Sequence, residues 1–229
     1  MTHRAYKLLL IFAIFPMLAG FLWYAGQVWK GVPVRAELLQ AQQAAVLGTH
    51  QVSLLPLSGE TDNLSGEFGE PVENFTARIT KKSFGIYITP DTSPVQPDRF
   101  TGFHAGIDAE YDDVSGDVPV RAIAAGRVMV SQFVRGYGGV VVIEHTLNGQ
   151  TLQALYGHLD SASMVSSGSE VSPGETLGIL GEGGTEETDG ARKHLHFALL
   201  KSEKLDLRGY VREEQELSGW HNPLNFSYR

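Results

Sequence analysis

The stretch "GGVVVIEHTLNGQTLQALYGHL", residues 138–159, decides the fold class. Two runs rich in β-branched and aromatic residues, 140–145 and 151–158, flank Asn148-Gly149. Asn-Gly is the strongest short hairpin signal, because both residues accept positive φ in a tight turn. The stretch therefore predicts two antiparallel strands joined by a short turn.

The sequence on either side also consists of short runs typical of strands, separated by Gly and Pro. "VPVRAIAAGRVMVSQFV" (118–134) predicts a second strand pair, turning at Ala125-Gly126, and "GSEVSPGETLGILGEGG" (168–184) predicts a turn followed by another strand. "HLHFALL" (194–200) is a further strand. Between 77 and 200 no periodic segment has the length of a helix, so we expect an all-β domain, a small antiparallel β-barrel or sandwich.

The N-terminus carries a different signal. Residues 8–29, "LLLIFAIFPMLAGFLWYAGQVW", contain no charge and are long enough to span a bilayer, whereas a signal peptide has an apolar core of about 7–15 residues. Residues 1–29 are therefore predicted to form one transmembrane helix; the alternative is cleavage after Ala19 or Ala25 and secretion. Arg4 and Lys7 favour a cytoplasmic N-terminus, which places the rest of the chain outside the bacterial cytoplasmic membrane, in the periplasm or on the cell-wall side.

Composition narrows the remaining possibilities. Residues 30–76 are expected to be a spacer with a short helix at 34–47 and short strands, and residues 77–229 to form the β domain. A net charge of −8 with no basic stripe argues against binding to nucleic acid. Because the chain has no Cys, any transition metal must be held by His and carboxylates.

The histidines supply such ligands. Residues i and i+2 of a strand share a face, so His194 and His196 point the same way. His104 and Asp108 form a His-x3-Asp spacing, and His158 ends the hairpin. Chance alone gives about 0.3 His-x-His pairs at this composition, so each piece is weak by itself. Together they predict a catalytic zinc site, which takes three protein ligands and leaves two groups for acid–base work.

In order, "SFGIYIT" (83–89), "FHAGID" (103–108), "YGHL" (156–159) and "HLHF" (194–197) resemble the lysostaphin and LytM type of zinc metallopeptidases over about residues 77–229. The resemblance implies a small antiparallel barrel of the duplicated hybrid motif type and a cell-wall endopeptidase that cuts peptidoglycan stem peptides or cross-bridges. It assigns one zinc ion to His104, Asp108 and His196, and makes His158 and His194 the catalytic pair, one relaying the water proton and one stabilising the oxyanion.

The chain departs from this family at two places. "TDGARK" replaces the common Gly-Pro step before His-x-His, and Ala198 replaces a Glu that often follows it. Both changes touch the rim of the site and put the choice of substrate in question. We also expect His145 to be a half-exposed strand residue, and the acidic loops at 110–117 and 182–189 to be a solvated face and a cleft rim.

Two other functions fit parts of the pattern. Barrels of this family that have lost ligands act as non-catalytic regulators that activate other wall hydrolases; here all five positions are filled, which favours an enzyme. A histidine phosphocarrier has a related barrel, but that role needs neither a membrane anchor nor Asp108. Peptidoglycan, the membrane and a regulatory protein are the expected partners.

Overall fold

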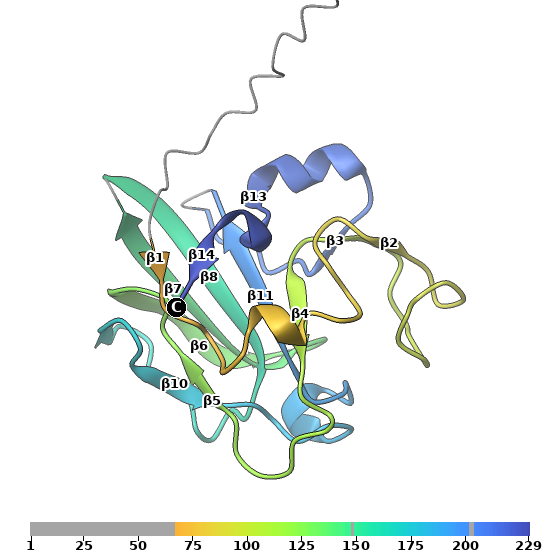
Figure 1. Ribbon diagram of the computed structural model, residues 1–229, viewed down its shortest axis with the longest axis horizontal. Coiled ribbons are helices and arrows are strands. Elements are labelled where there is room, and N and C mark those ends of the chain that lie inside the picture. The colour runs from red at the N-terminus through yellow and green to blue at the C-terminus, as the bar shows by residue number, and fades with distance from the viewer. Residues whose placement is uncertain (1–66, 148, 202–203) are drawn as a thin grey trace, which may run out of the picture. The chain divides into compact units, whose positions relative to one another are not determined.

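The computed structural model describes residues 67–147, 149–201 and 204–229. In these residues strands dominate, and the helical segments are short 3-10 turns (Figure 1). The all-β class is confirmed. Within this part of the chain, no helix combines the length and apolarity needed to cross a membrane. The anchor predicted for residues 8–29 and the helix predicted for 34–47 lie outside the described residues.

The elements follow one another in a simple order. They are β1 (Glu67–Phe68), η1 (Thr76–Arg78), β2 (Tyr87–Ile88), β3 (Gly102–His104), β4 (Ile107–Glu110), β5 (Pro119–Arg121), β6 (Gly126–Val134), β7 (Gly138–Leu147), β8 (Gln150–Leu159), β9 (Glu170–Val171), β10 (Thr176–Ile179), η2 (Glu186–Thr188), β11 (His194–Leu200), β12 (Tyr210–Val211), η3 (Glu214–Gly219), β13 (Trp220–His221), η4 (Pro223–Asn225) and β14 (Ser227–Tyr228).

One large antiparallel sheet organises the domain. Its strands run in the order β13-β11-β8-β7-β6-β9, and β4 pairs with β11 off this path. The hairpin predicted at 138–159 is confirmed, since β7 and β8 pair with Leu147 opposite Gln150. Gly149 has a φ of 79°, the positive value that the tight turn requires. The strand predicted at 194–200 is β11.

Two expectations about strand pairing are wrong. β5 and β6 do not pair with each other: β5 pairs with β10, and β6 pairs with β7 and β9. The backbone between them is bound elsewhere, because the N–H of Ala122 donates to Glu175 and the carbonyl of Ile123 accepts from Gly69. The described strands also do not close into a barrel: β9 and β13 are the two ends of the sheet, and smaller sheets, including the parallel pair β1–β14, lie beside it.

Both faces of the large sheet are covered by apolar side chains. Val141 and Ile143 of β7 belong to the main core, whereas Val140 and Val142 belong to a second, smaller cluster. On β11, the side chains of Leu195, Phe197 and Leu199 point into the main core. Those of Ala198 and Leu200 point into the second cluster. Because strand side chains alternate, His194 and His196 lie on the face of the second cluster.

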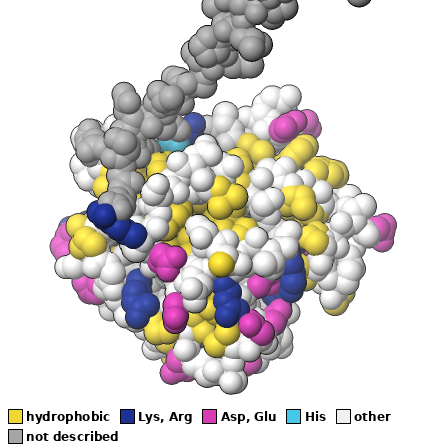
Figure 2. Space-filling model, viewed as in Figure 1, with side chains coloured by type: hydrophobic (Ala, Val, Ile, Leu, Met, Phe, Trp, Pro, Cys, Tyr) yellow, Lys and Arg dark blue, Asp and Glu magenta, His cyan; other side chains and the backbone are white. Residues whose placement is uncertain are grey.

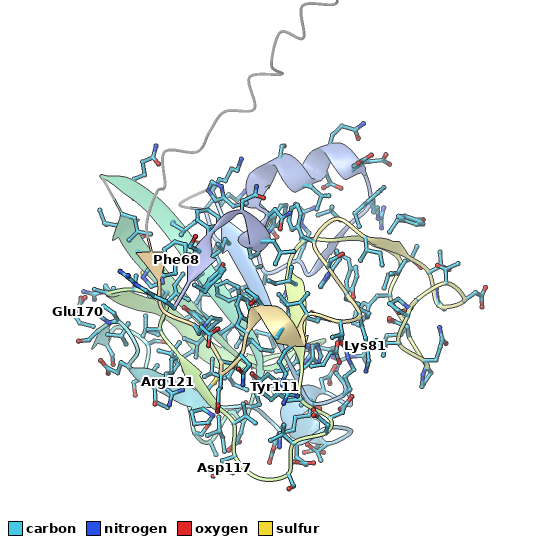
Figure 3. The ribbon with its side chains drawn as sticks, in the orientation of Figure 1. Phe68, Lys81, Tyr111, Asp117, Arg121 and Glu170 are labelled. Carbon is cyan, nitrogen blue, oxygen red and sulfur yellow. The ribbon has the colours of Figure 1, made fainter. Side chains whose placement is uncertain are left out.

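The segment before residue 77 packs into the same core. Phe68, Val72 and Phe75 are buried in the main cluster, and the Phe75 ring contacts that of Phe197 edge-on at 5.4 Å. Phe68, labelled in Figure 3, lies in β1 opposite Tyr228 of the parallel neighbour β14. On the face drawn in Figure 2, Lys, Arg, Asp and Glu side chains are interspersed around apolar patches.

Candidate active site

Three neighbouring strands bring the predicted ligands together. β4 pairs with β11 in the register that sets Asp108 opposite His196. His104 ends β3, just before the Ala105-Gly106 turn into β4. Gly106 is required there, because a Cβ atom at this position would lie 2.7 Å from His196 Nε2 and 2.7 Å from the Phe197 carbonyl oxygen.

A β-bulge turns His158 into the same site. Tyr156 of β8 points into the main core, and strict alternation would send His158 the same way. The pairing with β7 shifts by one residue at this point, however, and His158 has a φ of 67°. Leu159 then takes the core position, and the His158 ring lies 4.1 Å from the His194 ring, centroid to centroid. Bulges of this kind re-aim side chains beside functional sites.

His104, Asp108 and His196 form a compact triangle of ligand atoms. The distances are 3.1 Å from His104 Nε2 to His196 Nδ1, 3.1 Å from His196 Nδ1 to Asp108 Oδ1 and 3.3 Å from His104 Nε2 to Asp108 Oδ1. Ligands at about 2.0–2.1 Å from a tetrahedral zinc ion lie about 3.3 Å apart. The side chains are 0%, 2% and 3% exposed in the same order, so the donor set fits zinc and could hold it.

Hydrogen bonds fix the orientation of two imidazoles. His104 Nδ1 lies 3.2 Å from the Ser83 carbonyl oxygen, and His194 Nδ1 lies 2.8 Å from the Arg192 carbonyl oxygen. A carbonyl only accepts, so Nδ1 carries the proton in both rings and Nε2 carries the lone pair. This places a ligand lone pair on His104 and a proton acceptor on His194.

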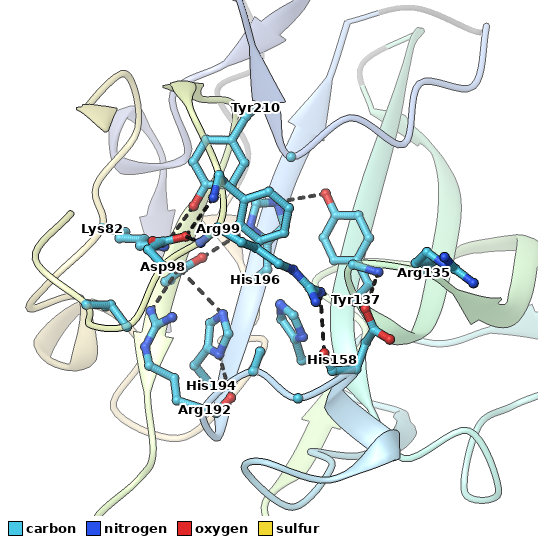
Figure 4. Close-up of a pocket in the computed structure, with 18 of the residues that line it drawn as sticks. Lys82, Asp98, Arg99, Arg135, Tyr137, His158, Arg192, His194, His196 and Tyr210 are labelled. Carbon is cyan, nitrogen blue, oxygen red and sulfur yellow. Dashed lines mark hydrogen bonds and ion pairs between the residues drawn. The ribbon is translucent and has the colours of Figure 1, made fainter. Parts of the chain in front are cut away.

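Arg192, labelled in Figure 4, connects Asp108 to Glu110, a second buried carboxylate. Its Nη2 donates to Asp108 Oδ2 at 2.8 Å, and its Nε donates to Glu110 Oε2 at 2.6 Å. Because the guanidinium occupies Oδ2, Oδ1 of Asp108 is left to face the two ligand histidines. In the sequence, Arg192 stands out only as part of a departure from the family pattern. Its partners lie more than 80 positions away, so no neighbouring residue indicates the pairing.

The site shifts the pKa of three of its groups away from their usual values. Burial alone raises the pKa of Asp108, but His104 and His194 beside it hold that pKa well below its usual range. Burial lowers the pKa of His158 to about 3. Burial, with His158 alongside, keeps the pKa of His194 well below its usual range as well. The Asp108 carboxylate is therefore ionised and the His158 and His194 imidazoles are neutral near pH 7, as metal binding and base catalysis require.

These pKa shifts predict a loss of stability in mild acid. The unfolded chain takes up a proton on His158 below about pH 6.5, whereas the folded chain does not until about pH 3. Stability therefore falls as pH falls, by about 1.4 kcal/mol per pH unit for this group. Urea unfolding of the metal-free chain at pH 6 and pH 5 should show the decline. In His158→Gln the free energy of unfolding should depend less on pH, by the amount that corresponds to about one proton taken up on unfolding. An unchanged slope in the variant would contradict the shift.

His158, His194 and His196 line a cleft of about 810 Å³, and His104 is fully buried beside His196. Tyr137 and Tyr210, which sequence analysis did not single out, line the cleft too. Tyr137 Oη lies 3.5 Å from His196 Nε2, and Tyr210 Oη accepts a hydrogen bond of 2.9 Å from Lys82. Burial raises the pKa of Tyr137 far above its usual range, so this hydroxyl stays a donor.

Other side chains singled out from the sequence have structural roles. His145 is buried, not half-exposed as expected, because its Nδ1 bonds to the Ala125 carbonyl at 2.9 Å. In the 110–117 loop, Asp112 accepts a hydrogen bond from the N–H of Lys193 at 2.8 Å. Asp117 is exposed near the outer end of this loop (Figure 3).

Comparison with known proteins finds a peptidase family. The model described as "Peptidase family M23" matches residues 102–207. The chain is 40% identical over 82 residues to the murein hydrolase activator EnvC of Escherichia coli (strain K12), covering 36% of this chain and 18% of that protein. It is 35% identical over 99 residues to an uncharacterized protein of Haemophilus influenzae, covering 43% and 22%. The chain thus spans less than a quarter of either relative.

Among solved structures, that of LytU is 27% identical and has a TM-score of 0.43, covering 64% of this chain and 81% of that one. The sequence match rests on the family model, whose range includes every candidate ligand and catalytic histidine. Residues 102–207 of this chain therefore form a domain of peptidase family M23.

Proposed function

We propose that the chain is a zinc-dependent endopeptidase that hydrolyses peptide bonds in peptidoglycan stem peptides or cross-bridges. The observation that carries the proposal is the complete set of five side chains at one site: four line the cleft, and the buried His104 contacts His196. His104, Asp108 and His196 fit one zinc ion, and His158 and His194 lie beside them without being needed as ligands. Family membership supports a peptidase.

The two remaining imidazoles divide the proton chemistry. A zinc ion in the triangle would supply a Lewis acid and a water of lowered pKa. His194 Nε2 accepts the water proton, because its Nδ1 proton is held by the Arg192 carbonyl. Asp108 Oδ2, 3.5 Å away, stabilises the resulting imidazolium. His158 donates a hydrogen bond to the oxyanion that develops on the scissile carbonyl.

Tyr137 orients the ligand His196. When His196 binds metal through Nδ1, its Nε2 carries the proton and faces the Tyr137 hydroxyl at 3.5 Å. Such contacts fix the ring orientation of metal-bound histidines. The phenol proton is then free to point into the cleft.

The proposal includes a place in the cell. Residues 8–29 would anchor the protein in the cytoplasmic membrane with the β domain on the outer side, where peptidoglycan is found. A regulatory protein partner is also proposed, on the basis of the similarity to an activator of murein hydrolases.

The test uses the 229-residue chain and purified peptidoglycan. We expect about one zinc ion per chain and the release of new amino groups from the wall. A chelator should stop the release, and added zinc should restore it. Hydrolysis that survives removal of zinc, or zinc binding without hydrolysis, would contradict an endopeptidase.

A second candidate function is a non-catalytic activator of other wall hydrolases, favoured by the 40% identity to EnvC. It predicts that the chain increases the activity of a separate purified murein hydrolase. The increase should persist in His194→Ala, since an activator does not need the proton acceptor. Loss of the increase in that variant would favour the enzyme.

A further inference from the structure

The cleft concentrates positive charge in an acidic protein. The whole chain has a net charge of −8. The cleft lining reverses this balance, with six Lys or Arg residues against three Asp. A positive cleft raises the local concentration of anions. The cations are Lys82, Arg99, Arg135, Arg192, Arg208 and Arg212.

Most of these cations are already engaged or point elsewhere. Arg135 points away from the histidines in Figure 4. Three others are held by carboxylates of the chain itself: Lys82 by Asp98, Arg192 by Asp108 and Glu110, and Arg208 by Asp206 and Glu216.

Arg99 is exposed and pairs with one carboxylate. Its side chain is 57% exposed, and its Nη2 donates to Asp189 Oδ2 at 2.6 Å. Exposed ion pairs contribute only about 0.2–1 kcal/mol, so a second carboxylate can exchange with the first. Asp189 does not depend on Arg99 for its position, since Oδ2 also accepts a hydrogen bond of 2.8 Å from the N–H of Gly136.

A series of ring contacts connects the Arg99 guanidinium to a candidate metal ligand. It lies 5.2 Å from the centre of the Phe100 ring, which stacks on Tyr210 at 5.1 Å. Tyr210 in turn contacts the ring of the ligand His104 at 5.0 Å. Asp189 directly follows η2 and lines the same cleft. The Arg99–Asp189 pair therefore joins two segments of the cleft lining that lie 90 positions apart in the sequence.

We infer that Arg99 anchors a free carboxylate of the substrate peptide, and that Asp189 occupies this anchor until the substrate arrives. The inference rests on the proposed function and deepens it, because it selects peptides that carry a carboxylate near the bond to be cut over neutral peptides. Arginine suits the task because its planar donors match the two oxygens of a carboxylate. The carboxylate can belong to a side chain or to a peptide C-terminus.

Binding to the metal-free chain tests the inference separately from catalysis. The probe is a fluorescein-labelled stem tetrapeptide, compared with one form amidated at the C-terminus and one amidated at the side-chain carboxylate. We expect one amidation to weaken binding about tenfold in fluorescence anisotropy, and the affected form to identify the source of the carboxylate. Equal binding of all three peptides would overturn the inference.

Substitutions of Arg99 and of Asp189 should change peptide binding in opposite directions. Arg99→Gln should remove the preference for the carboxylate, and Arg99→Lys should keep part of it. Asp189→Asn should tighten binding, because it removes the competing charge and keeps an acceptor for the N–H of Gly136. Arg127→Gln is the matched control, since Arg127 is a similarly exposed arginine paired with Glu170 outside the cleft. Weaker binding in Asp189→Asn, or an equal loss in Arg127→Gln, would contradict the anchor.

Cleavage of the same peptides by the zinc-loaded chain separates the two proposals. A carboxylate preference in binding without cleavage supports the anchor and contradicts the endopeptidase. Cleavage of all three peptides at equal kcat/KM contradicts the anchor and supports the endopeptidase.

Discussion

Replacing His196 with alanine is expected to abolish both zinc binding and hydrolysis, whereas replacing His194 is expected to abolish hydrolysis alone. His196 Nδ1 is one corner of the ligand triangle, 3.1 Å from each of its nearest partners in the other two residues. His194 contributes no atom to the triangle, and loss of a general base lowers kcat by about 10²–10⁴-fold. Elemental analysis gives the zinc content, and release of amino groups from peptidoglycan gives the activity.

His145→Gln controls for the loss of a buried imidazole, because His145 lies outside the cleft. It should keep both zinc and activity. Circular dichroism establishes that each variant is folded. If His194→Ala lost zinc as well, or if His196→Ala kept it, the division between ligand and catalyst would be wrong.

Replacing Arg192 with methionine is expected to have the largest effect on stability, about 3 kcal/mol in the metal-free chain. The Arg192 side chain is 12% exposed, and its partners Asp108 and Glu110 are 2% and 10% exposed. Removing one partner of a buried ion pair leaves uncompensated charge, which costs roughly 3–5 kcal/mol. Urea unfolding measures the loss. Saturating zinc should recover part of it, because the metal compensates Asp108.

Arg127→Met provides the comparison. Arg127 and Glu170 are 60% and 73% exposed, so their loss should cost no more than about 1 kcal/mol. Equal effects of the two substitutions, or no recovery of Arg192→Met by zinc, would show that Arg192 does not support the site.

The sequence predicts those features that depend on neighbouring residues. Asn148-Gly149 specifies the β7–β8 hairpin, and the i, i+2 spacing puts His194 and His196 on one face of β11. Strand partners far apart in sequence carry no such signal. β5 and β6 follow each other like a hairpin, yet β5 pairs with β10, and the open ends of the sheet were likewise not predictable.

The candidate site shows the same division. The five side chains were predicted from their spacing and from a family resemblance, and the structure brings them together, with four lining the cleft and His104 buried against His196. The bulge that turns His158 toward them was not foreseen, since a bulge arises from register against β7 and not from the residue itself. Nor was Arg192, whose importance depends on the burial of two distant carboxylates.

The left-handed backbone of His158 sets catalysis against stability. A residue with a side chain costs roughly 1–2 kcal/mol in this conformation, and glycine adopts it freely. Selection for a more stable fold alone would thus favour glycine at position 158 and would discard the imidazole. If the proposed catalysis requires this imidazole, a relative that no longer catalyses the reaction would gain stability by replacing His158 with glycine.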